Sequence, residues 1–273
     1  MSRLSFKAVV FPLIAIGAFT ACDEDSATEP LTDAEAVIVA DQAMSDADQD
    51  VGHARAPGIP GLRVPRRIFQ IGTGDIPDCP RDESGAYVCS HEGFGNLEGT
   101  TRITFFDESG TVQDAYDEEL TASVHIESDM EGTLDRGRFT GSMSRSRDLV
   151  VTGLLGEETA RVWNGTTQGA STRTHTAGEL AGEEISTTST STIEDLTLPL
   201  PENETGPFPL SGVITTEMSA TGGPRAGDHS VVIVFDGTQF ATITVDGEEM
   251  TVDLLARRDG HHGLGPRHTG GGN

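Results

Sequence analysis

The stretch Ser230–Leu255, SVVIVFDGTQFATITVDGEEMTVDLL, decides the fold class. It contains three short runs of β-branched and aromatic residues, which are joined by the pairs Asp236-Gly237 and Asp246-Gly247. An Asp-Gly pair between such runs is a strong hairpin signal, because a two-residue type I′ turn needs positive φ at both central residues. The stretch therefore predicts a three-stranded antiparallel meander.

The two turns also predict which residues share a face. A two-residue loop at the second Asp-Gly pair places Ile243 opposite Met250, and the same rule at the first pair places Val232 opposite Ala241. We expect these residues on the inward face, together with Val234, Val252 and Leu254. The other face then carries a second apolar patch that nothing in the meander covers, so we expect either the helix predicted at residues 33–45 or a partner to cover it. It is the candidate interaction patch: Val231, Ile233, Phe235 and Phe240.

Short alternating runs with turn residues between them continue through residues 68–257. Strands at close, uneven spacing predict an all-β fold, an antiparallel meander that forms an up-and-down barrel, a half-barrel or a sandwich. One predicted strand places Arg145 and Arg147 on an otherwise apolar face with Leu149 and Val151. We expect the two arginines to pair with acids on neighbouring strands; the alternative is a cavity that receives an anionic group.

Composition excludes several classes of partner and chemistry. The chain has 273 residues and a formal net charge of −26, from 44 acidic and 18 basic residues. This balance argues against nucleic acid, whose phosphates need clustered Lys and Arg, and against adsorption to anionic lipid. Lys7 is the only lysine, so residues 8–273 cannot supply a P-loop lysine or a Schiff-base lysine.

Residues 1–21 are predicted to be a secretory signal peptide. They have a positive start, with Arg3 and Lys7, and then an apolar run that is too short to span a bilayer comfortably. The sequence Phe19-Thr20-Ala21-Cys22 follows, with small residues before the cysteine.

This arrangement resembles the lipobox of bacterial lipoproteins. The resemblance implies cleavage before Cys22, a diacylglycerol thioether on that cysteine and an acylated amino end, which together form a stable membrane anchor. It implies a lipid-anchored protein of the bacterial cell envelope, on the periplasmic face or the cell surface. The alternative is an ordinary signal peptide cut after Ala21.

The other two cysteines are predicted to form a disulfide. Export places Cys79 and Cys89 in an oxidising compartment, and lipidation of Cys22 leaves them as a pair. Their spacing does not match the Cys-x-x-Cys of redox or metal sites. We expect the bond to clamp a hairpin.

Residues 22–67 are predicted to be a tether that contains one short helix. Thr32 and Glu35 form a capping box for a helix over about 33–45, which either stands the domain off the membrane or docks on the sheet. The acidic run at 46–52 is expected to be a solvated helix end rather than a calcium loop. Residues 52–67 form a Pro/Gly-rich linker, and the Gly/His-rich tail, 258–273, is predicted to be disordered.

No catalytic motif stands out. The chain has no Gly-x-Ser-x-Gly and no His-Glu-x-x-His, and the histidines of the tail favour adventitious metal binding. We therefore expect no enzymatic activity, no cofactor and no metal site. The sequence favours a structural or protein-interaction role in the envelope, with an envelope protein as partner. The alternative is a carrier of a hydrophobic ligand.

Overall fold

The computed structural model describes residues 33–52, 79–92, 96–135, 137, 139–156, 158–176, 181–200, 208–223 and 226–258. Cys22, the predicted signal peptide, the linker after residue 52 and the tail after residue 258 lie outside the described residues. None of the described helices is long and apolar enough to cross a membrane.

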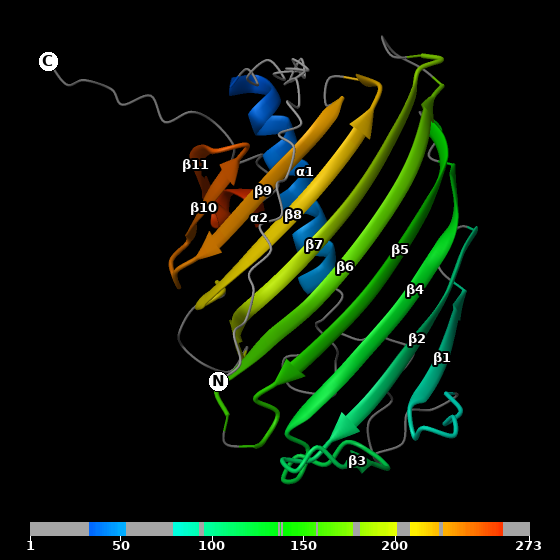
Figure 1. Cartoon of the computed structure of the whole chain (residues 1–273), viewed down its shortest axis with the longest axis vertical. Coiled ribbons are helices and arrows are strands. Elements are labelled where there is room, and N and C mark those ends of the chain that lie inside the picture. The colour runs from blue at the N-terminus through cyan, green and yellow to red at the C-terminus, as the bar shows by residue number, and fades with distance from the viewer. Residues whose placement is uncertain are drawn as a thin grey trace, which may run out of the picture. The chain divides into compact units, whose positions relative to one another are not determined.

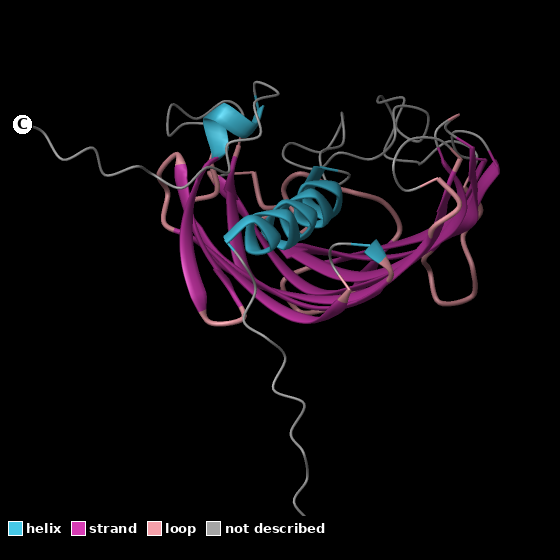
Figure 2. Ribbon diagram, turned by 90° about the horizontal axis from the view of Figure 1, so that it is seen from above, coloured by secondary structure: helices cyan, strands magenta, loops and turns pink. Residues whose placement is uncertain are grey.

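The strands form a single antiparallel sheet in the order β1-β2-β4-β5-β6-β7-β8-β9-β10-β11, with β3 paired to β2 (Figure 1). The prediction of an all-β antiparallel meander is confirmed. The sheet is open, and it curves like half a barrel around the helix α1 (Figure 2). The strands are β1 (Tyr87–Glu92), β2 (Asn96–Phe106), β3 (Val112–Gln113), β4 (Ser123–Asp135), β5 (Phe139–Thr152), β6 (Ala160–His175), β7 (Glu184–Pro199), β8 (Ser211–Thr221), β9 (Gly227–Phe235), β10 (Phe240–Val245) and β11 (Glu248–Asp253). The helices are α1 (Asp33–Gly52) and α2 (Leu254–Arg258).

The turn between β10 and β11 is the predicted one. Asp246 and Gly247 both have positive φ, 50° and 90°. Ile243 pairs with Met250, as the two-residue loop requires. The register of this hairpin is confirmed.

The turn between β9 and β10 is longer than predicted, and the register prediction there is wrong. The Asp236 carboxylate accepts hydrogen bonds from the amide and the hydroxyl of Thr238, which opens the connection into a four-residue loop. Ala241 consequently pairs with Phe235 instead of Val232. A shift of three residues is odd, so it exchanges the two faces of β9.

Helix α1 packs against the concave face of the sheet (Figure 2). Its buried residues recur at helical spacing and join the core cluster of the sheet. The helix continues to Gly52, beyond the predicted end at about residue 45, because Met44 and Ala47 are also buried against the sheet. The acidic run at 46–52 is therefore helical. The buried stripe is Ala36, Val39, Ala40, Ala43, Met44 and Ala47.

Two irregularities bend the central strands. The pairing shifts between Trp163 and Gly165 on β6, and again between Glu194 and Thr197 on β7. Asn164 Oδ1 accepts a hydrogen bond of 2.8 Å from the amide of Asp195, which links the two irregularities. β-Bulges increase local twist, so they help this sheet to curve around α1.

The disulfide Cys79–Cys89 is present, as predicted. It joins residue 79 to β1, and the amide of Val88 donates to the carbonyl of Pro80 at 2.8 Å. The segment from Cys79 thus covers part of the outer edge of β1, which reduces the exposed backbone of this edge strand.

Candidate functional site: the concave face of the sheet

The predicted interaction patch is not exposed. Val231 and Ile233 are fully buried and Phe235 is 8% exposed, because the register shift turns them toward α1. The helix α1 contacts β9 and β10, so the chain itself covers these residues. Phe240 is half-buried. The prediction of a patch open to a partner is therefore wrong, and the other alternative, that the predicted helix covers these residues, is confirmed.

The outer face of β9 carries the residues that were expected inside. Val234 is 40% exposed and Val232 is half-buried. Val234 pairs with Val213 of β8, which is also half-buried, so the three valines form a small apolar area on the outer face.

The concave face is apolar toward one end of the strands. Trp163 of β6 is the largest fully buried side chain, and Leu149 and Val151 of β5 lie in the neighbouring strand. A core of this kind excludes water and lowers the local dielectric constant. Other members are Ile103, Phe105, Val124, Ile193, Leu196, Ile214, Ile233 and Ile243.

The concave face changes from apolar to polar and charged side chains at the two arginines of β5. Arg145 and Arg147 are each only 9% exposed, and they lie on the same face as Leu149, as the alternation predicts. Arg145 Nη2 donates to the carbonyl of Asp46 at 3.0 Å, and its Nη1 lies 3.8 Å from Asp46 Oδ1. Arg145 is therefore paired, but its acidic partner is on α1 and not on a neighbouring strand as predicted.

Arg147 lies at the start of a buried row of hydroxyl side chains. Its Nη1 is 3.5 Å from Ser128 Oγ of β4. On the other side it pairs in register with Thr167, which pairs with Ser191, and Ser191 pairs with Thr216. The hydroxyls of Ser191 and Thr216 are 2.9 Å apart, and the side chains of Thr167, Ser191 and Thr216 are buried. From Arg147 to Thr216 the row crosses β5, β6, β7 and β8 on the concave face.

A buried histidine lies at the far side of the same face. His229 of β9 is 3% exposed, and its Nδ1 lies 2.9 Å from Asp246 Oδ2. Its Nε2 is buried without a hydrogen-bond partner. The sequence assigned Asp246 only to the turn, although its carboxylate also accepts the amide of Ser230 at 2.8 Å.

Arg161 is the most deeply buried of the described arginines, at 2% exposed. Its Nη1 donates to the carbonyls of Gly153 and Ala160. Burial lowers the pKa of Arg161, and burial likewise raises the pKa of Tyr116, which interacts with it electrostatically. Sequence reasoning did not single out this pair, because nothing local shows that the two residues meet.

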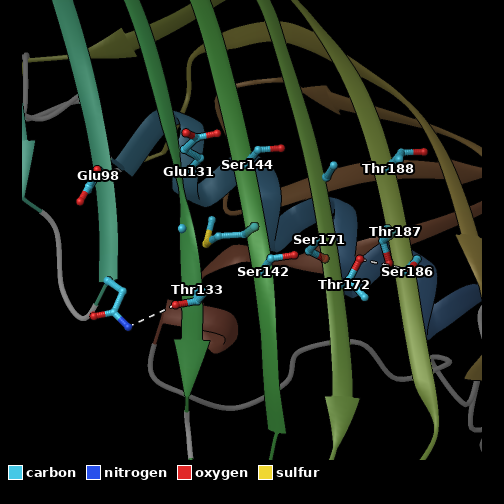
Figure 3. A pocket seen from close by; sticks show the side chains of 14 residues that line it. Glu98, Glu131, Thr133, Ser142, Ser144, Ser171, Thr172, Ser186, Thr187 and Thr188 are labelled. Atoms are coloured by element: carbon cyan, nitrogen blue, oxygen red, sulfur yellow. Dashed lines mark hydrogen bonds between the residues drawn. The ribbon is translucent and has the colours of Figure 1, made fainter.

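A shallow hollow of about 530 Å³ lies over β2, β4, β5, β6 and β7 (Figure 3). Its lining consists mainly of hydroxyl side chains. The row that Ser142 forms in register with Thr133, Thr172 and Ser186 belongs to the outer face of the sheet, because Ser142 alternates along β5 with the buried Arg145 and Arg147. Glu98 and Glu131 lie at one side.

The described residues contain no group of three or more His, Cys, Asp or Glu side chains that could hold a metal ion. No protein-family model matches the chain, and neither a curated protein nor a solved structure is significantly similar to it.

Proposed function

We propose that this is a lipid-anchored protein of the bacterial cell envelope whose β domain has a structural or protein-interaction role next to the membrane. The observation that carries the proposal is the packing of α1 in the core. Ten residues separate Cys22 from Asp33, the first residue of α1. A chain of that length spans at most about 40 Å, so an anchor on Cys22 holds the sheet close to the bilayer.

The anchor is tested on protein produced in a bacterial host. We expect the peptide that begins at Cys22 to carry the mass of three acyl chains, and the protein to sediment with membranes. The variant Cys22→Ser should be released from the membrane fraction. An unmodified Cys22 peptide, or membrane association that survives Cys22→Ser, would contradict the proposal.

The protein-interaction role is tested by photo-crosslinking. Amine-reactive reagents are unsuitable because Lys7 is the only lysine. A photoreactive residue at Val234, on the outer face, should capture a stoichiometric envelope protein, whereas the same residue at Ile233, inside the core, should not. Capture at neither site, or equally at both, argues against a partner at this face.

A carrier of a hydrophobic ligand is the second candidate function. The concave face favours it, because an apolar end and a row of buried polar and cationic groups lie next to each other beneath one helix. Native mass spectrometry of the protein extracted from its membrane separates the two roles: a co-purifying lipid favours the carrier, and a protein partner without lipid favours the interaction module.

A further inference from the structure

Two buried arginines on one strand need a physical reason. Each ion that leaves water costs several kcal/mol before pairing, and apolar side chains of similar size often stabilise a core better. Arg145 and Arg147 nevertheless stand beneath α1, each 9% exposed. A face that only had to be closed by a helix would not require them.

The contact of Arg145 with α1 shows which chemistry this position recognises. The Arg145 guanidinium donates a hydrogen bond to the main-chain carbonyl of Asp46, and it forms an ion pair with the carboxylate of the same residue. In register, Arg145 pairs with Met130 on β4 and Gly169 on β6, and neither is acidic. When α1 leaves, the arginine therefore loses an anionic partner that these register neighbours cannot replace.

We infer that the concave face binds an acyl chain with an anionic head group, and that α1 is the occupant which this amphiphile displaces. The inference rests on the second proposed function, the carrier. The head group takes the place of Asp46 at Arg145, next to Arg147 and the hydroxyl row. The acyl chain takes the place of α1 against the apolar end of the face.

The packing of α1 makes such an exchange energetically feasible. The buried stripe of the helix consists of four alanines, Val39 and Met44. These side chains bury roughly ten methyl and methylene groups in all. An acyl chain gains the same free energy for each methylene that it buries, so about ten buried methylenes compensate for the lost helix.

We therefore expect the affinity for a fatty acid to depend on the length of its acyl chain and on the charge of its head group. A hexanoate chain is too short to displace α1, whereas a palmitate chain is long enough. The head group adds a charge-assisted hydrogen bond of about 1.5–3 kcal/mol, which corresponds to roughly a 10- to 150-fold preference for palmitate over its uncharged methyl ester.

The test uses the chain from residue 22 onward with Cys22→Ser, since the chain from Leu31 forms one compact unit and no acyl group of its own then competes. Titration calorimetry with palmitate, methyl palmitate and hexanoate measures affinity. Vesicles of phosphatidylglycerol and of phosphatidylcholine, in a separate arm, show whether the amphiphile is extracted from a bilayer as a phospholipid or bound as a free fatty acid.

The variant Arg145→Gln should weaken palmitate binding at least about tenfold and leave methyl palmitate unchanged. Asp46→Asn removes the competing carboxylate and should strengthen palmitate binding. Arg102→Gln is the matched control, because Arg102 is more exposed and bonds Glu127 Oε2 at 3.2 Å. Equal palmitate affinity in Arg145→Gln and Arg102→Gln would overturn the inference.

A second measurement does not depend on these variants. Spin labels at Ile38→Cys on α1 and Val150→Cys on β5, both partly exposed positions, report the distance between helix and sheet. Palmitate should change this distance and hexanoate should not. An unchanged distance, or no binding of palmitate at all, refutes the exchange. The mass of the Cys22 peptide is an independent result, so the anchor can be correct while this inference fails.

Discussion

Replacing Ile233 by Ala tests which face of β9 belongs to the core. Ile233 is fully buried under α1, whereas Val234, the next residue, is 40% exposed on the outer face. A buried Ile→Ala change costs about 2–5 kcal/mol, from lost transfer energy and the cavity left behind. An exposed Val→Ala change costs at most about 1 kcal/mol, mainly from lower β-propensity.

The assay is urea unfolding followed by the fluorescence of Trp163, the single tryptophan, which is buried in the same core. At an m-value of about 3 kcal/mol per molar, Ile233→Ala should lower the midpoint by roughly 1 M, and Val234→Ala by much less. Both variants replace a β-branched residue of β9 by alanine, so the loss of β-propensity is similar and cancels when the two are compared. A loss at Val234 equal to or larger than that at Ile233 would restore the register of a two-residue turn and refute the observed one.

Three further perturbations probe local features. Reduction of Cys79–Cys89 should cost about 2–3 kcal/mol of stability, because it frees a ten-residue separation in the unfolded chain; a thermal melt with and without reductant measures it. The pKa of Asp107 is lowered, chiefly by the hydroxyl of Ser109, so its stabilisation is present above the unfolded pKa and is lost as the pH falls through the lower folded value; Asp107→Asn should flatten the loss of stability on acidification below about pH 4. Gly165→Ala places a Cβ 2.1 Å from the carbonyl oxygen of Asp148 at φ 144° and should cost at least about 2 kcal/mol, more than Gly137→Ala, where φ is also positive but nothing lies within 4 Å.

The two Asp-Gly pairs show how well the local sequence predicts the length of a turn. Both were predicted to form two-residue turns, and the pair at Asp246 does so. At Asp236 the following Thr238 supplies a hydroxyl and an amide to the carboxylate, and this local hydrogen bonding favours a longer loop. The signal for this difference was present in the sequence as Asp-x-Thr. It could have been recognised by asking what else the aspartate can bond.

The end of α1 depends on distant residues. Asp, Val and Gly have low helix propensity, and they make up most of residues 46–52, so the sequence after residue 45 predicts that the helix ends there. The helix continues because Met44 and Ala47 pack against the concave face of the sheet. In addition, the carbonyl of Asp46 accepts a hydrogen bond from Arg145, a residue 99 positions away. Tertiary contacts of this separation override propensity, and no local pattern contains them.

One further inference from the sequence could have predicted which segment pairs with Arg145. The alternation correctly places Arg145 on the apolar face, and the strand register sets Met130 and Gly169 beside it, so the adjacent positions offer no acid. A buried arginine then needs its counter-charge from outside the sheet. The segment 33–52 combines an apolar stripe with acidic residues, which are the two properties that such a partner must have. The proposed exchange follows from the same charge complementarity: the carboxylate of an acyl chain would take the place at Arg145 that the acid of the amphipathic helix occupies.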